Sequence, residues 1–426
     1  MMKVLNVSIL SAILVSMALC DLSTPTLAMS EENPLEDNYD EEEDFMEEED
    51  LIAMQFAPDP YENQDKRELV LKGEFMLYEI HVPNDQIEET MGLFCKIDFT
   101  PHQQDPSQYP FYNDLVGESE HCLNHPVEFK LTDIAQEARQ YDSVIRNGMH
   151  SPAPKGFIFH QPHAGASLLA NTIMAASPET TRVVSPHRIM TRIFNIHDDP
   201  RNRSQQQQQQ IQTFQDAVYM FGRSSTSTMK NFYIREEPSA TAHLSSVRQA
   251  FPDTKWVFLY RDPNVVLSKT IEASHERRAC GFKNRRNPLK GLQGYVQSKS
   301  NKKKKVVDLT DEQACSAWLG LLLSSAQQEF EKDDGVVTGR LVNYDNEMNT
   351  EDGVMDVLEF LEVSTTEQEG AMERINEQRQ KKANGSSFEG ATAWNTVGSS
   401  TEESFSEEVV NANAEYVQAD MTELKL

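Results

Sequence analysis

Residues 156–176, GFIFHQPHAGASLLANTIMAA, combine residue types that could hold an anion. The bulky apolar run at 157–159 predicts a buried strand, and apolar residues at helical spacing follow a loop of small residues. Backbone amides and the positive end of the helix dipole at such a junction attract phosphate. The predicted phosphate-binding residues are His163, Ala164, Gly165, Ala166, Ser167 and Leu168.

A second strand-to-helix junction lies further along the chain, in AFPDTKWVFLYRDPNVVLSKTIEA at 250–273. Arg261 follows the predicted strand, and its planar guanidinium suits bidentate binding of a terminal phosphate better than Lys. Gly165 lets the backbone approach a ligand because it has no Cβ. Ser167 either donates its hydroxyl to a phosphate or simply begins the helix, and the two roles are compatible. The ordinary nucleoside-triphosphate loop GxxxxGK(S/T) is excluded because its Lys and its first Gly are missing.

Together the two segments resemble the PAPS-dependent sulfotransferase family, where PAPS is 3'-phosphoadenosine 5'-phosphosulfate. In that family a loop written P(R/K)SGTT or PRSGST holds the 5'-phosphosulfate, and an R(D/N)P turn followed by Ser holds the 3'-phosphate. The resemblance covers residues 150–275 well and 335–365 more weakly, where a Tyr-Asp pair follows a predicted strand. It implies a P-loop NTPase-like α/β core, PAPS as sulfuryl donor, and no metal.

The sequence departs from the family pattern at three positions. His163 stands where the family carries Arg or Lys, and Ala166 stands where it carries a hydroxyl. An imidazole with a pKa of about 6.5 is only partly charged at neutral pH. Ser268 lies one residue earlier than usual, which puts Lys269 at the expected place, and one residue rotates a helix by about 100°. Either side chain could contact the 3'-phosphate.

Sulfuryl transfer needs a base for the acceptor hydroxyl or amine. The family often places a Glu shortly after the first helix, whereas TRVVSPHRIMTRIF at 181–194 has no carboxylate after Ser185. His187 is the nearest group that can take a proton and is the predicted catalytic residue, although a solvated surface histidine is the ordinary alternative. His160, at the end of the first strand, is a further candidate.

The N-terminal 28 residues read as a secretory signal peptide, with a short signal anchor as the alternative. Residues 29–66 are dominated by acidic side chains and predict a disordered tail. The signal peptide predicts that the protein enters the secretory pathway and is either secreted or kept in the Golgi lumen. Membrane attachment is expected only if residues 1–28 are retained as an anchor. Without Cys20, four cysteines remain, and Cys95–Cys122 with Cys280–Cys315 is one of three disulfide pairings.

Residues 67–150 predict a small, partly β region, with a hairpin or bent strand at 68–82 and a helix at 134–145. Residues 151–426 predict an α/β domain in which helices cover both faces of a parallel sheet and ligands bind at the carboxyl ends of its strands. A glutamine-rich segment at 201–212 and a basic segment at 277–308 are predicted inserted loops. The basic loop is either solvated or forms a lip that attracts an acidic or sulfated acceptor.

The net charge of −29 argues against nucleic acid as a partner. His121, Cys122 and His125 lack a second pair of ligands, so no metal site is predicted. Three functions remain open. The first is a sulfotransferase, whose acceptor could be a glycan, a tyrosine or a lipid. The second is a degenerate sulfotransferase-like scaffold that has lost turnover, and the third is a small-molecule kinase. The absence of GK(S/T) makes the kinase the weakest of these.

Overall fold

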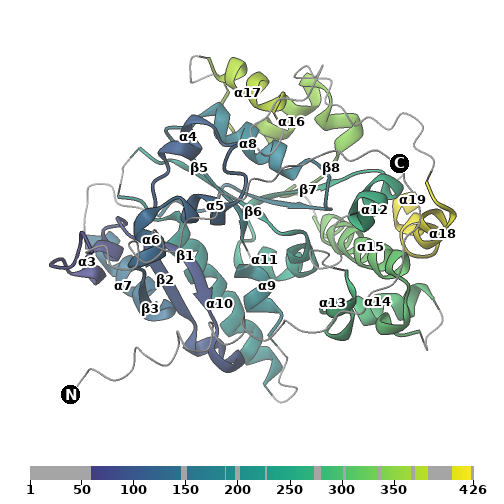
Figure 1. The fold of residues 1–426 in the computed structure, drawn as a ribbon, viewed down its shortest axis with the longest axis horizontal. Helices are drawn as coiled ribbons and strands as arrows, with labels where there is room; N and C mark the ends of the chain where they lie inside the picture. The colour runs from purple at the N-terminus through teal and green to yellow at the C-terminus, as the bar shows by residue number, and fades with distance from the viewer. Residues whose placement is uncertain are drawn as a thin grey trace, which may run out of the picture. The chain divides into compact units, whose positions relative to one another are not determined.

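The computed structural model describes residues 59–144, 151–187, 189–196, 202–225, 228–272, 280–300, 304–333, 337–365, 370–381 and 405–423 (Figure 1). The predicted signal peptide and most of the predicted tail lie outside these residues. Within them, no helix has both the length and the apolar character needed to cross a membrane.

The N-terminal region contains a three-stranded antiparallel sheet in the order β1-β2-β3. Its strands are β1 (Met76–His81), β2 (Met91–Cys95) and β3 (Val127–Lys130). The hairpin or bent strand predicted at 68–82 is a strand only in its second half, β1, because residues 66–71 form helix α3 (Lys66–Leu71) and β1 pairs with β2. The reason is the Asp65 carboxylate, which caps α3 by accepting from the Arg67 amide at 2.9 Å. Ordered structure begins before residue 67, since Lys66 Nζ lies 2.5 Å from Asp59 Oδ2.

Short helices fill the connections between the strands of this region, and the longer helix α7 follows β3. The helix predicted at 134–145 is confirmed as α7. The elements are η1 (Pro83–Asp85), η2 (Ile87–Glu89), α4 (Thr100–Gln104), α5 (Tyr112–Gly117), α6 (Glu120–Asn124) and α7 (Leu131–Val144).

The second sheet is parallel and has five strands, in the order β5-β6-β4-β7-β8. Both predicted phosphate-binding segments begin at carboxyl ends of neighbouring strands, β4 and β7, near the middle of the sheet. The strands are β4 (Gly156–His160), β5 (Thr181–His187), β6 (Asn231–Glu236), β7 (Lys255–Tyr260) and β8 (Gly339–Asn343).

Helices cover both faces of this sheet, which confirms the predicted α/β architecture. The first face packs against α9 (Ile189–Phe194), α10 (Arg203–Gly222), η3 (Pro238–His243), α11 (Leu244–Ala250), α12 (Pro263–Glu272) and α15 (Asp311–Phe330). The second face packs against α8 (Ala166–Ala176), α16 (Glu351–Phe360) and α17 (Ala371–Arg379), which lie together in Figure 1.

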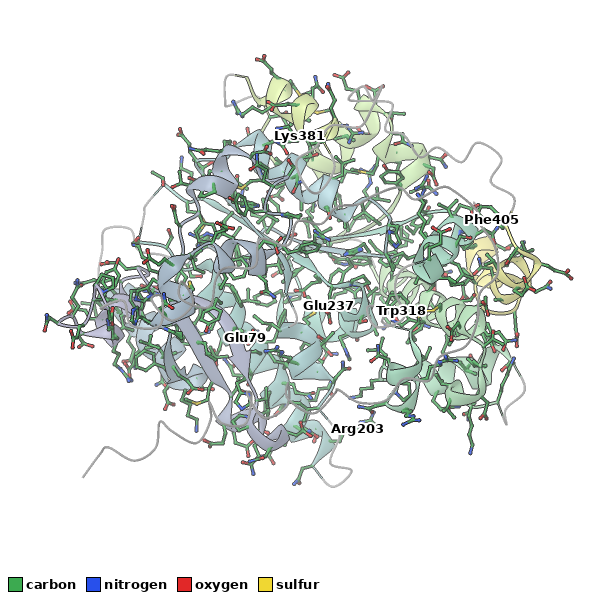
Figure 2. The ribbon with its side chains drawn as sticks, in the orientation of Figure 1. Glu79, Arg203, Glu237, Trp318, Lys381 and Phe405 are labelled. Carbon is green, nitrogen blue, oxygen red and sulfur yellow. A yellow bond between two sulfur atoms is a disulfide. The ribbon has the colours of Figure 1, made fainter. Side chains whose placement is uncertain are left out.

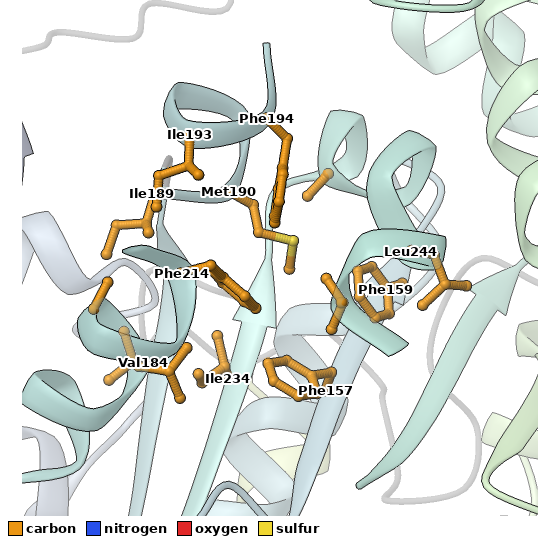
Figure 3. Packing of buried hydrophobic residues seen from close by; sticks show 14 of the residues in the cluster. Phe157, Phe159, Val184, Ile189, Met190, Ile193, Phe194, Phe214, Ile234 and Leu244 are labelled. Carbon is orange, nitrogen blue, oxygen red and sulfur yellow. The ribbon is translucent and has the colours of Figure 1, made fainter. Parts of the chain in front are cut away.

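Strand alternation explains the two faces. Phe157 and Phe159 of β4 belong to the core under α9 and α10, whereas Ile158 packs toward α8. Figure 3 shows the first of these cores, where Phe214 and Phe194 pack over the strands. Because β4 is buried on both faces, its carboxyl end is held rigidly and can position a binding loop.

The prediction of a loop at 201–212 is wrong, because residues 203–222 form the long helix α10. Glutamine is a good helix former, and the run is anchored on one side by the core. Gln210 is buried and its Nε2 donates to the Ile193 carbonyl oxygen at 3.0 Å. Phe214, one turn later, packs among the sheet residues shown in Figure 3.

The described part of the basic segment, residues 280–300 and 304–308, is not the single loop predicted. It contains α13 (Phe282–Arg286), α14 (Leu292–Lys299) and the short turn η4 (Val306–Asp308). The disulfide Cys280–Cys315 ties its beginning to α15, and Cys95–Cys122 ties β2 to α6. These two bonds are the pairing named from the sequence, one of the three that four cysteines allow.

The C-terminal helices α18 (Glu407–Tyr416) and α19 (Gln418–Glu423) return to pack on α12, α14 and α15. Tyr416 is fully buried there, and the Tyr295 hydroxyl donates to Asp420 Oδ2 at 2.6 Å. The C-terminal segment is therefore part of the described core.

Candidate phosphate-binding and proton-transfer site

The predicted strand–loop–helix unit is present at β4 and α8. Gly165 precedes α8 with φ of 82°, and no side chain caps the helix. His163 also has a positive φ, of 58°. The backbone amides of the first turn of an α-helix have no partners within the helix. Those of α8, including Ser167 and Leu168, are therefore placed to bind an anion at this loop.

The second unit lies beside the first because β7 pairs with β4, with Leu259 opposite His160. Arg261 is buried, with 3% of its surface exposed. Its backbone amide donates to Gln161 Oε1 at 3.3 Å, which links the two segments directly. The Gln161 side chain is fully buried, and its Nε2 donor has no hydrogen-bond partner within the described part of the chain.

The helix after Arg261 carries both residues between which the sequence could not choose. Ser268 and Lys269 are each half-buried in α12. The positive charge of Lys269 contributes to lowering the pKa of His163. Lys269 therefore lies within electrostatic reach of the loop, which favours it as a phosphate contact without excluding Ser268.

A third segment completes the site. The π-helical turn η5 (Tyr344–Met348) follows β8 and places Tyr344 against the loop, where a Cβ on Gly165 would clash with the Tyr344 ring. The Arg261 guanidinium lies 4.9 Å from the centre of the same ring. Its Nε donates to Asp345 Oδ1 at 2.9 Å. The sequence marked the Tyr-Asp pair only by resemblance, and its contacts with both motifs are visible only in the tertiary structure.

The charge of His163 differs from that of the Arg or Lys found at this position in the sulfotransferase pattern. Loss of hydration and the nearby Lys269 and Arg261 charges lower its pKa, although its side chain is exposed, and Glu272 opposes this only in part. His163 therefore carries less positive charge at neutral pH than a free imidazole, whereas an Arg or Lys there would be fully charged.

Replacing His163 with Arg is expected to strengthen binding of 3'-phosphoadenosine 5'-phosphate (PAP) about three- to tenfold at pH of about 7.5, because it supplies a permanent charge. In the unmodified protein, affinity should rise as pH falls through the lowered pKa, and the Arg variant should lose this rise. Calorimetric titration at several pH values measures both effects. His163→Gln controls for titration of the ligand itself, and an Arg variant with unchanged affinity would contradict this role of His163.

The predicted base, His187, ends β5 directly opposite Glu236 of β6. The structure thus brings its backbone to the carboxyl edge of the sheet, and the position of its side chain lies outside what the structure describes. His160 is buried between two carbonyl oxygens, with Nδ1 2.8 Å from that of Gln161 and Nε2 3.1 Å from that of Glu236. Burial lowers its pKa to about 3, so His160 joins the strands and stays neutral.

Glu236 is a candidate base that the sequence reasoning missed. It ends β6, next to β4, and only 2% of its surface is exposed. Its Oε2 has no hydrogen-bond partner within the described residues. Burial, together with the neighbouring charge of Glu237 (labelled in Figure 2), raises the pKa of Glu236 well above the usual value. Once it has lost its proton, a buried carboxylate at this edge, with one oxygen unsatisfied among the described residues, can accept a proton from a reacting group.

Three cations of the basic segment are paired with carboxylates of the described chain. Lys299 lies 2.5 Å from Asp420, and Lys304 lies 2.9 Å from Glu415, both in the C-terminal helices. Arg285 pairs with Asp311. These pairs leave less positive charge for attracting an acceptor than the sequence implied, so the acceptor-binding lip stays a prediction.

A cavity of about 440 Å³ lies away from this site, near the amino ends of β4 and β7. The polar groups around it are satisfied internally, as where Gln215 Nε2 donates to the Ala250 carbonyl oxygen at 2.8 Å. Across the described ranges, no group of three or more His, Cys, Asp or Glu residues is arranged to hold a metal ion. The groups at the candidate site that could do chemistry are those of the loop, Arg261, Glu236 and their neighbours.

No protein-family model and no curated protein matches this sequence. Its solved structural neighbours include sulfotransferase domains. One, from the Synechococcus PCC 7002 olefin synthase, is 12% identical with a TM-score of 0.32, covering 63% of this chain and 95% of that chain. Another, from the curacin biosynthetic pathway, is 12% identical with a TM-score of 0.32, covering 62% and 97%.

A sulfotransferase from Mycobacterium tuberculosis H37Rv is 9% identical, with a TM-score of 0.32 and coverage of 58% of this chain and 75% of that chain. Similarity at this level assigns no function to this chain.

Proposed function

We propose that this protein transfers a sulfuryl group from PAPS to a hydroxyl or amine acceptor. The observation that carries the proposal is the link between two distant segments. The Gly165 loop and Arg261 lie on neighbouring strands, and Gln161 bonds to the Arg261 amide. Tyr344 contacts both.

The residues present fit such a donor. The amides at the start of α8 and the Gln161 Nε2 donor, which is buried without a partner among the described residues, suit the oxygens of the 5'-phosphosulfate. Arg261, with Lys269 or Ser268, suits the 3'-phosphate. When bound, PAPS supplies the sulfuryl group and leaves as PAP, so the site needs no metal for this chemistry.

Glu236 takes the proton that the acceptor oxygen or nitrogen loses as its bond to sulfur forms and the bond from sulfur to the leaving phosphate breaks. His187, opposite Glu236 on β5, is the alternative base that the sequence proposed. Because the Glu236 carboxyl is buried, it must lose its proton before it can act, so we expect turnover to rise with pH through its raised pKa.

The secretory setting and the acceptor are part of the proposal. The two disulfides of the described chain are consistent with an oxidising compartment, in line with the signal peptide predicted from the sequence. Among acceptors, a glycan, a tyrosine and a lipid alcohol all supply the hydroxyl that this chemistry requires.

The test is calorimetric titration of the protein with PAP, beside an Arg261→Met variant. We expect micromolar binding, weakened about 10- to 100-fold by the substitution because a charge-assisted phosphate contact is lost. Lys269→Met is a second variant, expected to weaken binding less. Absence of PAP binding by the folded protein would reject the sulfotransferase function. Tight binding of ATP with magnesium in place of PAP would favour the kinase, and PAP binding without turnover would favour the scaffold.

A further inference from the structure

Arg261 already has an anionic partner within the chain. Its Nε lies 2.9 Å from Asp345 Oδ1, and its side chain is 4% exposed, whereas that of Asp345 is 27% exposed. A buried guanidinium requires a counter-ion, because an uncompensated charge in the interior is costly. Asp345 fills this role at the edge of the candidate phosphate site, where a ligand can still reach it.

The position of Asp345 is set by a network that is independent of Arg261. The Asn343 amide donates to Glu347 Oε1 at 2.8 Å, and the Asn346 amide donates to Asn343 Oδ1 at 3.0 Å. Arg340 Nη2 lies 2.6 Å from Glu347 Oε2. These bonds close the π-helical turn η5 and hold Asp345 beside β7. π-helical turns of this kind often occur at functional sites.

We propose that Asp345 is the internal counter-ion of the phosphate site and that an incoming phosphate must share or displace it on Arg261. This rests on the proposed function, because it assigns the phosphate to Arg261. Since the carboxylate repels an anion and occupies one edge of the guanidinium, it lowers phosphate affinity. It also keeps the buried guanidinium neutralised between binding events.

An alternative role predicts the opposite sign. If Asp345 only oriented the guanidinium for its ligand, removing its charge would weaken phosphate binding. The counter-ion role predicts stronger binding in the same variant, so one substitution separates the two.

The experiment measures the thermal unfolding midpoint of the intact protein and of Asp345→Asn as inorganic phosphate is added. We expect the variant to start from a lower midpoint than the unmodified protein, since Arg261 has lost its counter-ion. It should then gain more stability from phosphate, with an apparent affinity about tenfold tighter. The double variant Arg261→Met/Asp345→Asn should lose this added response, because no guanidinium is left to bind phosphate.

Asp262→Asn is the matched control. It removes the same charge beside Arg261, but its side chain accepts from the Asn264 amide at 2.8 Å at the start of α12, a role that Asn also fills. Its response to phosphate should match that of the unmodified protein.

An equal or weaker phosphate response in Asp345→Asn would overturn the counter-ion role. PAP titration is run in parallel and reports on the proposed function by itself. If Asp345→Asn shows the larger stabilisation by inorganic phosphate but the protein does not bind PAP, the counter-ion role of Asp345 is supported and the sulfotransferase function is rejected.

Discussion

Replacing Glu236 with Gln is expected to lower the turnover number by about 10²- to 10⁴-fold, the usual contribution of a positioned general base. Gln has nearly the same shape and cannot take a proton. Binding of PAP should stay unchanged, because Glu236 lies on β6, while the proposed phosphate contacts lie at the start of α8, at Gln161 and Arg261 just after β4 and β7, and on α12. The measurement is release of PAP from PAPS in the presence of a sulfated glycan, a tyrosine peptide or a lipid alcohol, with hydrolysis by water as the baseline.

The neighbouring Glu237→Gln serves as the control and should retain turnover. A residual pH dependence in Glu236→Gln would report on the remaining base, for which His187 is the candidate. Full turnover in Glu236→Gln together with loss in His187→Gln would assign the proton transfer to His187 and refute the role of Glu236.

The Glu236 substitution also has a stability signature. Because burial raises its pKa, the folded state favours the protonated carboxyl. Its contribution to stability is complete at low pH, below the unfolded pKa, and is lost as pH rises toward the folded pKa. Glu236→Gln should therefore be relatively more stable than the unmodified protein at alkaline pH, which chemical denaturation at several pH values can measure.

Replacing Gly165 with Ala is expected to destabilise the fold by about 2–5 kcal/mol. Two causes add: Ala is strained at a φ of 82°, and its Cβ would meet the Tyr344 ring. Because Tyr344 also contacts Arg261, the damage should spread to PAP affinity. The free energy of unfolding from urea titration measures the first effect, and calorimetry measures the second.

Gly294→Ala is the control, because its Cβ would meet nothing within 4 Å, and it should keep stability or raise it by up to about 1 kcal/mol, since Gly294 lies within α14 and Ala is the better helix former. Tyr344→Ala removes the ring that the new Cβ at position 165 would meet but leaves the backbone strain. The double variant Gly165→Ala/Tyr344→Ala should therefore lose less stability than the sum of the losses of the two single variants. A Gly165→Ala variant as stable as the Gly294→Ala variant would show that this loop tolerates a side chain and does not need its close approach to Tyr344.

The sequence by itself determined the elements whose signals are local. β4 with its loop and α8, and β7 with Arg261 and α12, were predictable because apolar periodicity and small loop residues lie within one short window. The parallel arrangement with helices on both faces followed from the alternation of such windows. Composition gave a wrong prediction at 201–212, where a glutamine-rich segment forms part of helix α10. Buried residues such as Gln210 and Phe214 hold this helix against the core.

Only the tertiary structure decided how the site is assembled. The bond between Gln161 and Arg261, the contact of Tyr344 with Gly165 and the pairing of Asp345 with Arg261 join residues far apart in the chain. Glu236 looks like any acidic residue at a strand end, but it is buried at the end of β6, which lies between β5 and β4. Burial, and with it the pKa of a carboxyl group, is a property of the surrounding fold, so no local pattern of residues could reveal this candidate base.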